Sequence, residues 1–369
     1  MKAQIPKPLS TIYMPNYLYL KIELNPIDIK KSENILKKFN YHKYNERLEI
    51  FTSLKLKKGK TFAEEVKNGL SAKNKSLPPK YFYDKTGSLL FEKICKTKEY
   101  YPTVTEKKIL IAKAEEISKK NMKINLVTEL GSGSSEKSAY LIKAFLNERN
   151  SLHYIPIDVS EILYESSLNL VKKYKKLSVS GIISFYENGI KLIKSIDDSP
   201  KLILFLGSSI GNFTRKESVK FLTNVSRFMN PDDRLLVGFD LIKDENVLNN
   251  AYNDKDGYTK KFNLNILKRI NRELHANFPL SKFSHKAFYN SNKKRIEMHL
   301  IANDDLTVEI GDDKYKINFT KGESIHTENS CKFNFDMIHV LADQSGMKIS
   351  DQYTDNKNFF TITSLTLKT

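Results

Sequence analysis

The sequence predicts an α/β fold: a doubly wound, mainly parallel sheet with a second, smaller α+β domain attached. Three observations predict it. From residue 124, short apolar runs of strand length alternate with amphipathic runs of helix length, which is typical of a parallel sheet covered by helices on both faces. Between 242 and 332 this alternation weakens. The chain then ends in two strand-like segments, KISDQYTD and NFFTITSLTLK, which predict an antiparallel hairpin added to the sheet.

The residues before 124 predict a less regular region. A strand-like segment lies at 17–24 and a helix-like segment at 31–39. TFAEEVKNGL has apolar residues at helical spacing, and LPPK ends that helix because proline cannot continue it. SLLFEKICKT predicts a short amphipathic helix. A further helix of about four turns is expected to begin at Thr105.

The alternating region predicts its elements in order. Its strands are INLVTEL, HYIPIDVS, SVSGIIS, KLILFLGSS and DRLLVGFDLI. The helices expected between them include EKSAYLIKAFLNE, SEILYESSLNLVKKYKKL and RKESVKFLTNVSRFM, and a last helix, NFDMIHVLADQSG, precedes the hairpin. Because the alternation pauses after 242 and resumes near 333, we expect the smaller domain to be assembled from two separate pieces. The predicted division is 1–50 as an N-terminal extension, 51–105 with 242–332 as the smaller domain, and 106–241 with 333–369 as the sheet domain.

Composition limits the class of protein. Of the 369 residues 40% are hydrophobic, enough for a packed core, and no run of 18 apolar residues predicts a membrane span. The two cysteines are too few for a disulfide framework, so we expect a cytoplasmic protein. The net charge of +18 comes from lysines scattered among acidic residues, so we expect no nucleic-acid partner. The seven histidines show no metal-ligand spacing, and no metal is expected.

A glycine-rich loop follows the first strand of the alternating region. It reads Glu129-Leu-Gly-Ser-Gly-Ser-Ser135, and a helix begins directly after it. Glycine lets the backbone turn and approach a ligand closely, and Asp158, at the end of the next strand, can accept hydrogen bonds from ribose hydroxyls. A third glycine of the dinucleotide pattern is absent, because Ser135 and Glu136 occupy that region. The loop therefore favours a nucleoside without a pyrophosphate, such as S-adenosylmethionine.

Eight segments occur in the order seen in one enzyme family. They are LPPKYFYDKTGSLLFEKI, EYYPT, ELGSGSSEKS, IPIDVSE, FLGSSIGNF, FNLN, RIEMHL and TENSCKF, and they cover about residues 60–335. In these segments the chain resembles the histidine Nα-methyltransferases of the ergothioneine pathway. The resemblance implies Nα-methylation of a free amino acid, most of all L-histidine to its trimethylated betaine, with S-adenosylmethionine as donor. It also implies a Rossmann-like methyltransferase sheet for the larger domain, substrate binding by the smaller one, and a monomer.

The resemblance assigns the cofactor contacts residue by residue. Gly131, Lys137 and Asp158 match positions that contact S-adenosylmethionine in the family. The family's adenine-binding Gly-Asp-Phe aligns here with Ser184, Phe185 and Tyr186, so the acid that accepts the adenine amino group is missing. We expect Phe185 and Tyr186 to hold the ring by packing, or Glu187 to replace the missing acid.

The resemblance also assigns the substrate contacts. Tyr101, Asn212 and Tyr252 match residues that grip the amine and carboxylate, and Met298 matches a pocket residue. Glu328 and Ser330 match the pair that reads the imidazole ring. Because these two are separated by one residue in a strand-like segment, we expect both on one face. A carboxylate and a hydroxyl can satisfy the two ring nitrogens, one donating and one accepting.

Methyl transfer from a sulfonium is an in-line displacement, so the protein mainly aligns the reacting atoms. The sequence shows no dedicated base. Tyr101 and Tyr83 are the candidates for stabilising the growing ammonium through cation–π attraction. Three alternatives stay open: a methyltransferase for tryptophan or tyrosine derivatives, a binding protein of the same fold without catalysis, and an RNA-associated methyltransferase suggested by the charge.

Overall fold

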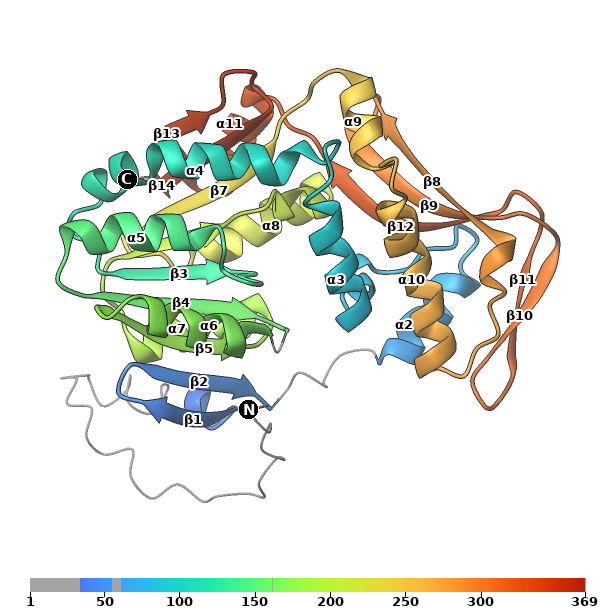
Figure 1. Ribbon diagram of the computed structural model, residues 1–369, viewed down its shortest axis with the longest axis horizontal. Helices are drawn as coiled ribbons and strands as arrows, with labels where there is room; N and C mark the ends of the chain where they lie inside the picture. The colour runs from blue at the N-terminus through green and yellow to red at the C-terminus, as the bar shows by residue number, and fades with distance from the viewer. Residues whose placement is uncertain (1–33, 55–60, 161, 369) are drawn as a thin grey trace.

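A nine-stranded mixed sheet forms the larger part of the molecule. The computed structural model describes residues 34–54, 61–160 and 162–368 (Figure 1). The strand order is β1-β2-β5-β4-β3-β6-β7-β14-β13. The strands are β1 (Phe39–Asn45), β2 (Leu48–Ser53), β3 (Leu126–Leu130), β4 (Leu152–Asp158), β5 (Leu177–Ile183), β6 (Lys201–Phe205), β7 (Arg234–Asp240), β13 (Met347–Thr354) and β14 (Phe360–Leu367). Strands β2 to β7 pair in parallel, which confirms the doubly wound α/β class.

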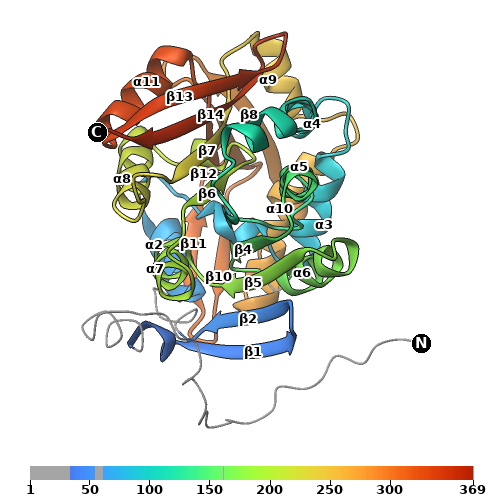
Figure 2. The same ribbon diagram turned by 90° about the vertical axis from the view of Figure 1, so that its left-hand side faces the viewer.

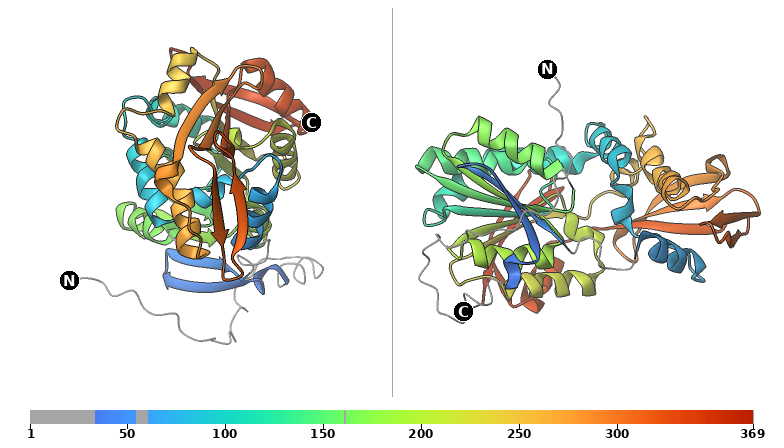
Figure 3. Two further views of the ribbon diagram at one scale, coloured as in Figure 1. Left: turned by 90° about the vertical axis from the view of Figure 1, so that its right-hand side faces the viewer. Right: turned by 90° about the horizontal axis from the view of Figure 1, so that it is seen from below.

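Helices cover both faces of this sheet, each over its own apolar core (Figure 3). One face is covered by α4 (Tyr101–Lys120), α5 (Ser138–Glu148) and α6 (Ile162–Lys173), and the other by α7 (Tyr186–Ile196), α8 (Arg215–Ser226) and α11 (Phe335–Gln344). Helix α4 begins at Tyr101, earlier than the expected Thr105, because Pro102 falls in its first turn, where no backbone N–H is required.

The C-terminal hairpin is confirmed. Strands β13 and β14 pair antiparallel with each other, and β14 pairs antiparallel with β7. The hairpin forms one end of the sheet, and β1 and β2 form the opposite end (Figure 2). No helix among the described residues is long and apolar enough to cross a membrane.

The N-terminal boundary differs from the expected one. Residues 39–53 are a hairpin of the large sheet, because β2 pairs in parallel with β5 and antiparallel with β1. Leu48 and Ile50 are buried in the core on one face, and Phe39 and Phe51 in the core on the other. This burial on both faces makes the segment part of the sheet domain. The strand expected at 17–24 lies outside the described residues, and the helix expected at 31–39 gives way to β1 at Phe39.

A third apolar core lies beside the sheet. Its elements are α2 (Phe62–Ser71), η1 (Pro79–Phe82), α3 (Lys85–Ile94), α9 (Glu245–Ala251), α10 (Tyr258–Glu273), η3 (Leu280–Lys282), β8 (Phe283–Asn290), β9 (Arg295–Ala302), β10 (Leu306–Ile310), β11 (Tyr315–Phe319) and β12 (Ser324–Cys331). The strands form a sheet of order β12-β9-β8 and the pair β10-β11. Residues from both stretches of the chain share this core; for example, the rings of Phe82 and Phe262 lie 4.5 Å apart.

Candidate functional site

The parallel strands β3 to β7 end at one edge of the large sheet, where ligands of doubly wound folds bind. The loop after β3, the end of β4 and the loop after β6 supply the predicted cofactor and substrate residues at this edge. Strand β12, from the smaller core, reaches the same edge. A side chain at Gly211, in η2 (Ser209–Asn212), would place its Cβ 2.9 Å from the carbonyl oxygen of Cys331.

The loop after β3 is folded tightly around an open space. Gly131, Gly133 and Ser135 have φ angles of 76°, 49° and 56°, in the left-handed region. The carboxylate of Asp158 accepts hydrogen bonds from the backbone N–H groups of Gly133, at 2.9 Å, and Ser160, at 2.8 Å. No atom lies within 4 Å of the position of a Cβ on Gly133. The loop therefore leaves room for a ligand next to a carboxylate, and burial raises the pKa of Asp158.

The segment after β5 brings one predicted adenine residue to this loop. A Cβ on Gly131 would lie 3.0 Å from the Tyr186 hydroxyl oxygen, so the tyrosine closes one side of the loop. Phe185 caps the N-terminus of α7 and is 42% exposed. Glu187, in the first turn of α7, is also exposed. Of these three residues, Tyr186 is the one that packs against the loop.

Lys137 is not a solvated lysine on a helix surface. Its Nζ lies 2.6 Å from Oε2 of Glu106, a fully buried residue of α4. The other oxygen of Glu106 accepts the backbone N–H of Gly207, at 2.8 Å. The ion pair therefore fixes the loop after β3 against the loop after β6. Glu106 was missed in the sequence because nothing marks which helical carboxylate is buried.

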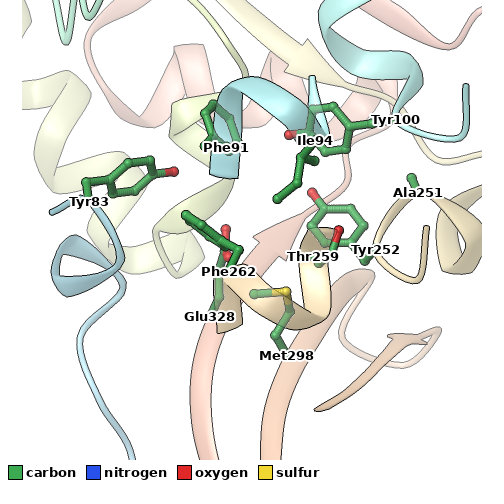
Figure 4. A pocket seen from close by; sticks show the side chains of 10 residues that line it. All are labelled: Tyr83, Phe91, Ile94, Tyr100, Ala251, Tyr252, Thr259, Phe262, Met298 and Glu328. Carbon is green, nitrogen blue, oxygen red and sulfur yellow. The ribbon is translucent and has the colours of Figure 1, made fainter. Parts of the chain in front are cut away.

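A pocket lies on the smaller core (Figure 4). Aromatic side chains and one carboxylate dominate its wall, which consists of Tyr83, Phe91, Ile94, Tyr100, Ala251, Tyr252, Thr259, Phe262, Met298 and Glu328. Three of the predicted substrate residues, Tyr252, Met298 and Glu328, are therefore brought together. Burial raises the pKa of Glu328 to about 7, and the charge of Lys332 acts in the opposite direction.

Tyr101 does not line this pocket. Its hydroxyl donates to Asp240, with oxygen–oxygen distances of 2.7 and 2.9 Å, and accepts a hydrogen bond from Lys243 at 2.8 Å. Its neighbour Tyr100 lines the pocket instead, with its ring 6.0 Å from that of Tyr252. Tyr101 is the first helical residue of α4 and Tyr100 precedes the helix, so the two side chains point in different directions. Of these two adjacent tyrosines, Tyr100 is therefore the one that lines the pocket.

The last two predicted residues lie next to the pocket wall. Ser330 is buried in β12, and its Oγ accepts a hydrogen bond of 2.7 Å from the Tyr252 hydroxyl. Asn212 is partly exposed at the end of η2, beside the end of β12. Ser330 therefore contacts the pocket residue Tyr252, and Asn212 does not line the pocket.

A buried charge network, absent from the sequence predictions, lies behind Ser330. Asp240, at the end of β7, pairs with Lys332 at 2.7 Å and with Lys243 at 2.5 Å. The side chains of these residues are 1%, 0% and 3% exposed, respectively. Lys332 also donates to Ser330 at 2.8 Å and to Tyr252 at 3.2 Å. We call Asp240, Lys243, Lys332 and Tyr101 the Asp240 network.

Among the described residues, no group of three or more histidine, cysteine, aspartate or glutamate side chains could hold a metal ion. The space beside Gly133, with a carboxylate at its rim, leaves room for a ribose, whose hydroxyls can donate hydrogen bonds to that carboxylate. The site thus combines an open space at the carboxyl edge of the sheet with a neighbouring pocket of aromatic side chains and one carboxylate.

Comparisons with known proteins agree on one family. The family model described as "Histidine-specific methyltransferase, SAM-dependent" matches residues 62–367. A histidine N-alpha-methyltransferase of Mycolicibacterium smegmatis is 38% identical, over 79% of this chain and 90% of that protein. One from Mycobacterium tuberculosis is 37% identical, over 80% and 92%. Ergothioneine biosynthesis protein 1 of Neurospora crassa is 36% identical over 53% of this chain and 23% of its own length.

Proposed function

Because this chain belongs to the S-adenosylmethionine-dependent, histidine-specific methyltransferase family, we propose that it methylates the α-amine of free L-histidine, up to the trimethylated betaine used in ergothioneine biosynthesis. The observation that carries the substrate assignment is Glu328, a carboxyl group with a raised pKa in an otherwise aromatic pocket. A carboxylate there accepts the N–H of an imidazole, and the Tyr252–Ser330 pair supplies a donor for the second ring nitrogen.

S-adenosylmethionine would supply an activated methyl group, and the side chains of this chain would orient the two reactants. The Asp158 carboxylate would hold the ribose, and the loop from Gly131 to Gly133 would allow close approach of the nucleoside. The Lys137–Glu106 pair would keep this loop at a fixed position relative to the loop after β6.

The aromatic wall of the pocket suits a product whose amine gains methyl groups and a permanent charge. Tyr83, Phe91, Tyr100 and Phe262 all line the pocket. Ring faces attract ammonium groups without donating hydrogen bonds, so they tolerate a nitrogen that loses its hydrogens. We propose Tyr100, in place of Tyr101, as the tyrosine that contacts the substrate amine.

The test is a count by mass spectrometry of methyl groups transferred to histidine, tryptophan and tyrosine by the purified protein. We expect trimethylhistidine as the main product. Faster methylation of tryptophan or tyrosine would contradict the imidazole assignment and favour the methyltransferase alternative for other amino acids. Binding without methylation of any amino acid would favour the non-catalytic alternative, and methylation of RNA alone would favour the third.

The cofactor assignment makes a separate prediction. Asp158→Ala is expected to weaken binding of S-adenosylhomocysteine by about 1–3 kcal/mol, because charged hydrogen bonds to the ribose are lost. Titration calorimetry measures this directly. The control is Asp198→Ala, which removes an exposed carboxylate just before β6, away from the carboxyl edge, and should leave the affinity unchanged. Equal affinities in all three proteins would rule out Asp158 as the ribose ligand.

A further inference from the structure

Lys332 is completely buried, and all of its hydrogen-bonding capacity is used inside the protein. Its Nζ donates to Asp240 Oδ2 at 2.7 Å, to Ser330 Oγ at 2.8 Å and to the Tyr252 hydroxyl at 3.2 Å. An ammonium group has three hydrogens and accepts none. Lys332 therefore has no hydrogen left for a ligand and acts only through its three partners.

Two of those partners are hydroxyls: that of Tyr252, which lines the pocket, and that of Ser330, next to the pocket wall. Tyr252 and Ser330 each accept a hydrogen from Lys332, and they are also bonded to each other at 2.7 Å. The two hydroxyls carry two hydrogens, and the Tyr252 hydrogen forms the bond between them, which leaves the hydrogen of Ser330. Since an ammonium cannot accept the other, one hydroxyl hydrogen is left to donate outside the group. The pair thus offers a ligand one donated hydrogen bond.

We propose that Lys332 is a positioning residue that fixes the Tyr252–Ser330 pair as the donor of a single hydrogen bond to the amino acid substrate. The proposal rests on the proposed function, and it adds a requirement: the group bound there must be an acceptor. In the same pocket Glu328 offers an acceptor, so one donor and one acceptor together match the two nitrogens of a neutral imidazole.

The position of Lys332 is set from the large sheet. Its partner Asp240 is the last residue of β7, and the backbone N–H of Asp240 donates to Ser208 Oγ, in the loop after β6, at 3.0 Å. Lys243 and Tyr101 bind the same carboxylate. The Asp240 network therefore ties the donor in the pocket to the sheet edge where the cofactor is proposed to bind.

The test compares Lys332→Met with Lys201→Met. Lys201 is the matched control, because it is also a buried lysine paired with a buried carboxylate: its side chain is 3% exposed and its Nζ lies 3.0 Å from Asp233. It differs in position, since it begins β6 at the opposite edge of the sheet. Both variants lose a buried ion pair and should lose similar thermal stability. Lys332→Met is expected to lower kcat/KM for histidine by about 30-fold or more, and Lys201→Met by less than about threefold, both assayed below their melting temperatures. Binding of S-adenosylhomocysteine should change by less than about twofold in either variant.

The preference for an imidazole ring is a second measurement, and it should not change if Lys332 only stabilises the fold. 3-(2-Thienyl)alanine has no ring nitrogen, so the wild type should prefer histidine strongly. That preference should shrink by about tenfold in Lys332→Met and stay constant in Lys201→Met. Equal losses in the two variants, or an unchanged preference in Lys332→Met, would overturn the proposal.

Two further provisions keep the test decisive. Should Lys332→Met fail to fold, the double variant with Asp240→Asn removes the unpaired carboxylate, and Lys201→Met with Asp233→Asn is its control. A wild type that leaves histidine unmethylated contradicts the proposed function. The Lys332→Met and Lys201→Met variants are then compared on the amino acid that the wild type methylates fastest. If the wild type methylates none, they are compared on the amino acid that it binds most tightly. Equal losses of activity or affinity in the two variants would again overturn the role of Lys332.

Discussion

Glu328→Ala is expected to lower kcat/KM for histidine by about 100- to 1000-fold, with no change in the affinity for S-adenosylhomocysteine. The carboxylate lies in a pocket whose other walls are mostly aromatic or aliphatic, so its loss leaves an imidazole N–H buried without a partner. Tryptophan should be affected far less. When tryptophan binds to the wild type, the carboxylate loses its water and faces a C–H edge of the indole, which is unfavourable. Alanine at this position removes that unfavourable contribution to the binding free energy.

The measurement is steady-state methyl transfer to histidine and to tryptophan, with wild type and variant compared on each. Glu297→Ala is the matched control: it removes a buried carboxylate from β9, one residue before the pocket residue Met298 and therefore on the opposite face of the same sheet. This control should leave the ratio of the two activities unchanged. If Glu328→Ala slows both amino acids by the same factor, the carboxylate does not read the ring.

The fold could be predicted where its determinants are local. Strands β3 to β7 are buried on both faces along most of their length, and β6 and β7 appear as nearly continuous apolar runs between helices with an apolar stripe. The hairpin of β13 and β14 is predicted by two strand-like segments joined by a short turn. The predicted division places β2 outside the sheet domain. Its partner, β5, lies more than 120 residues away in the chain, and no local sequence pattern indicates such a pairing. A parallel pairing of this kind is visible only in three dimensions.

The site residues likewise divide into those that the sequence predicts and those that only the structure shows. Tyr252, Met298 and Glu328 are assigned by the resemblance to the family, the last two within its matched segments, and the structure brings all three to one pocket. Tyr100 and Tyr101 are adjacent tyrosines in EYYPT, and the choice between them depends on where α4 begins. The Asp240 network could not be found from sequence, because Lys332 is one among 61 lysine and arginine residues. A buried lysine is distinguished only by the carboxylate opposite it, which here is 92 positions away.

The acid–base behaviour of Glu328 gives the last prediction. Burial raises its pKa to about 7, so the free enzyme should lose the carboxylate as the pH falls below 7. The protonated acid no longer accepts a hydrogen bond from the imidazole as a carboxylate does. The groups facing Glu328 are Tyr83, Tyr100, Tyr252 and Lys332, and the pKa of each of them is raised, so none changes charge in this range. Glu328 alone among these five groups therefore titrates near neutral pH.

The value of kcat/KM reports the ionisations of free enzyme and free substrate, and histidine itself titrates near pH 6.5 on its ring. Glu328→Gln isolates the contribution of the enzyme, since glutamine keeps an acceptor of similar size without titrating. Dividing the wild-type profile by that of Glu328→Gln cancels the substrate ionisations. We expect the ratio to be constant above about pH 8 and to fall about tenfold per pH unit below 7, reaching about a 100-fold loss at pH 5. A ratio that stays flat from pH 8 to pH 5 would mean that the ionised carboxylate of Glu328 has no part in recognising the substrate.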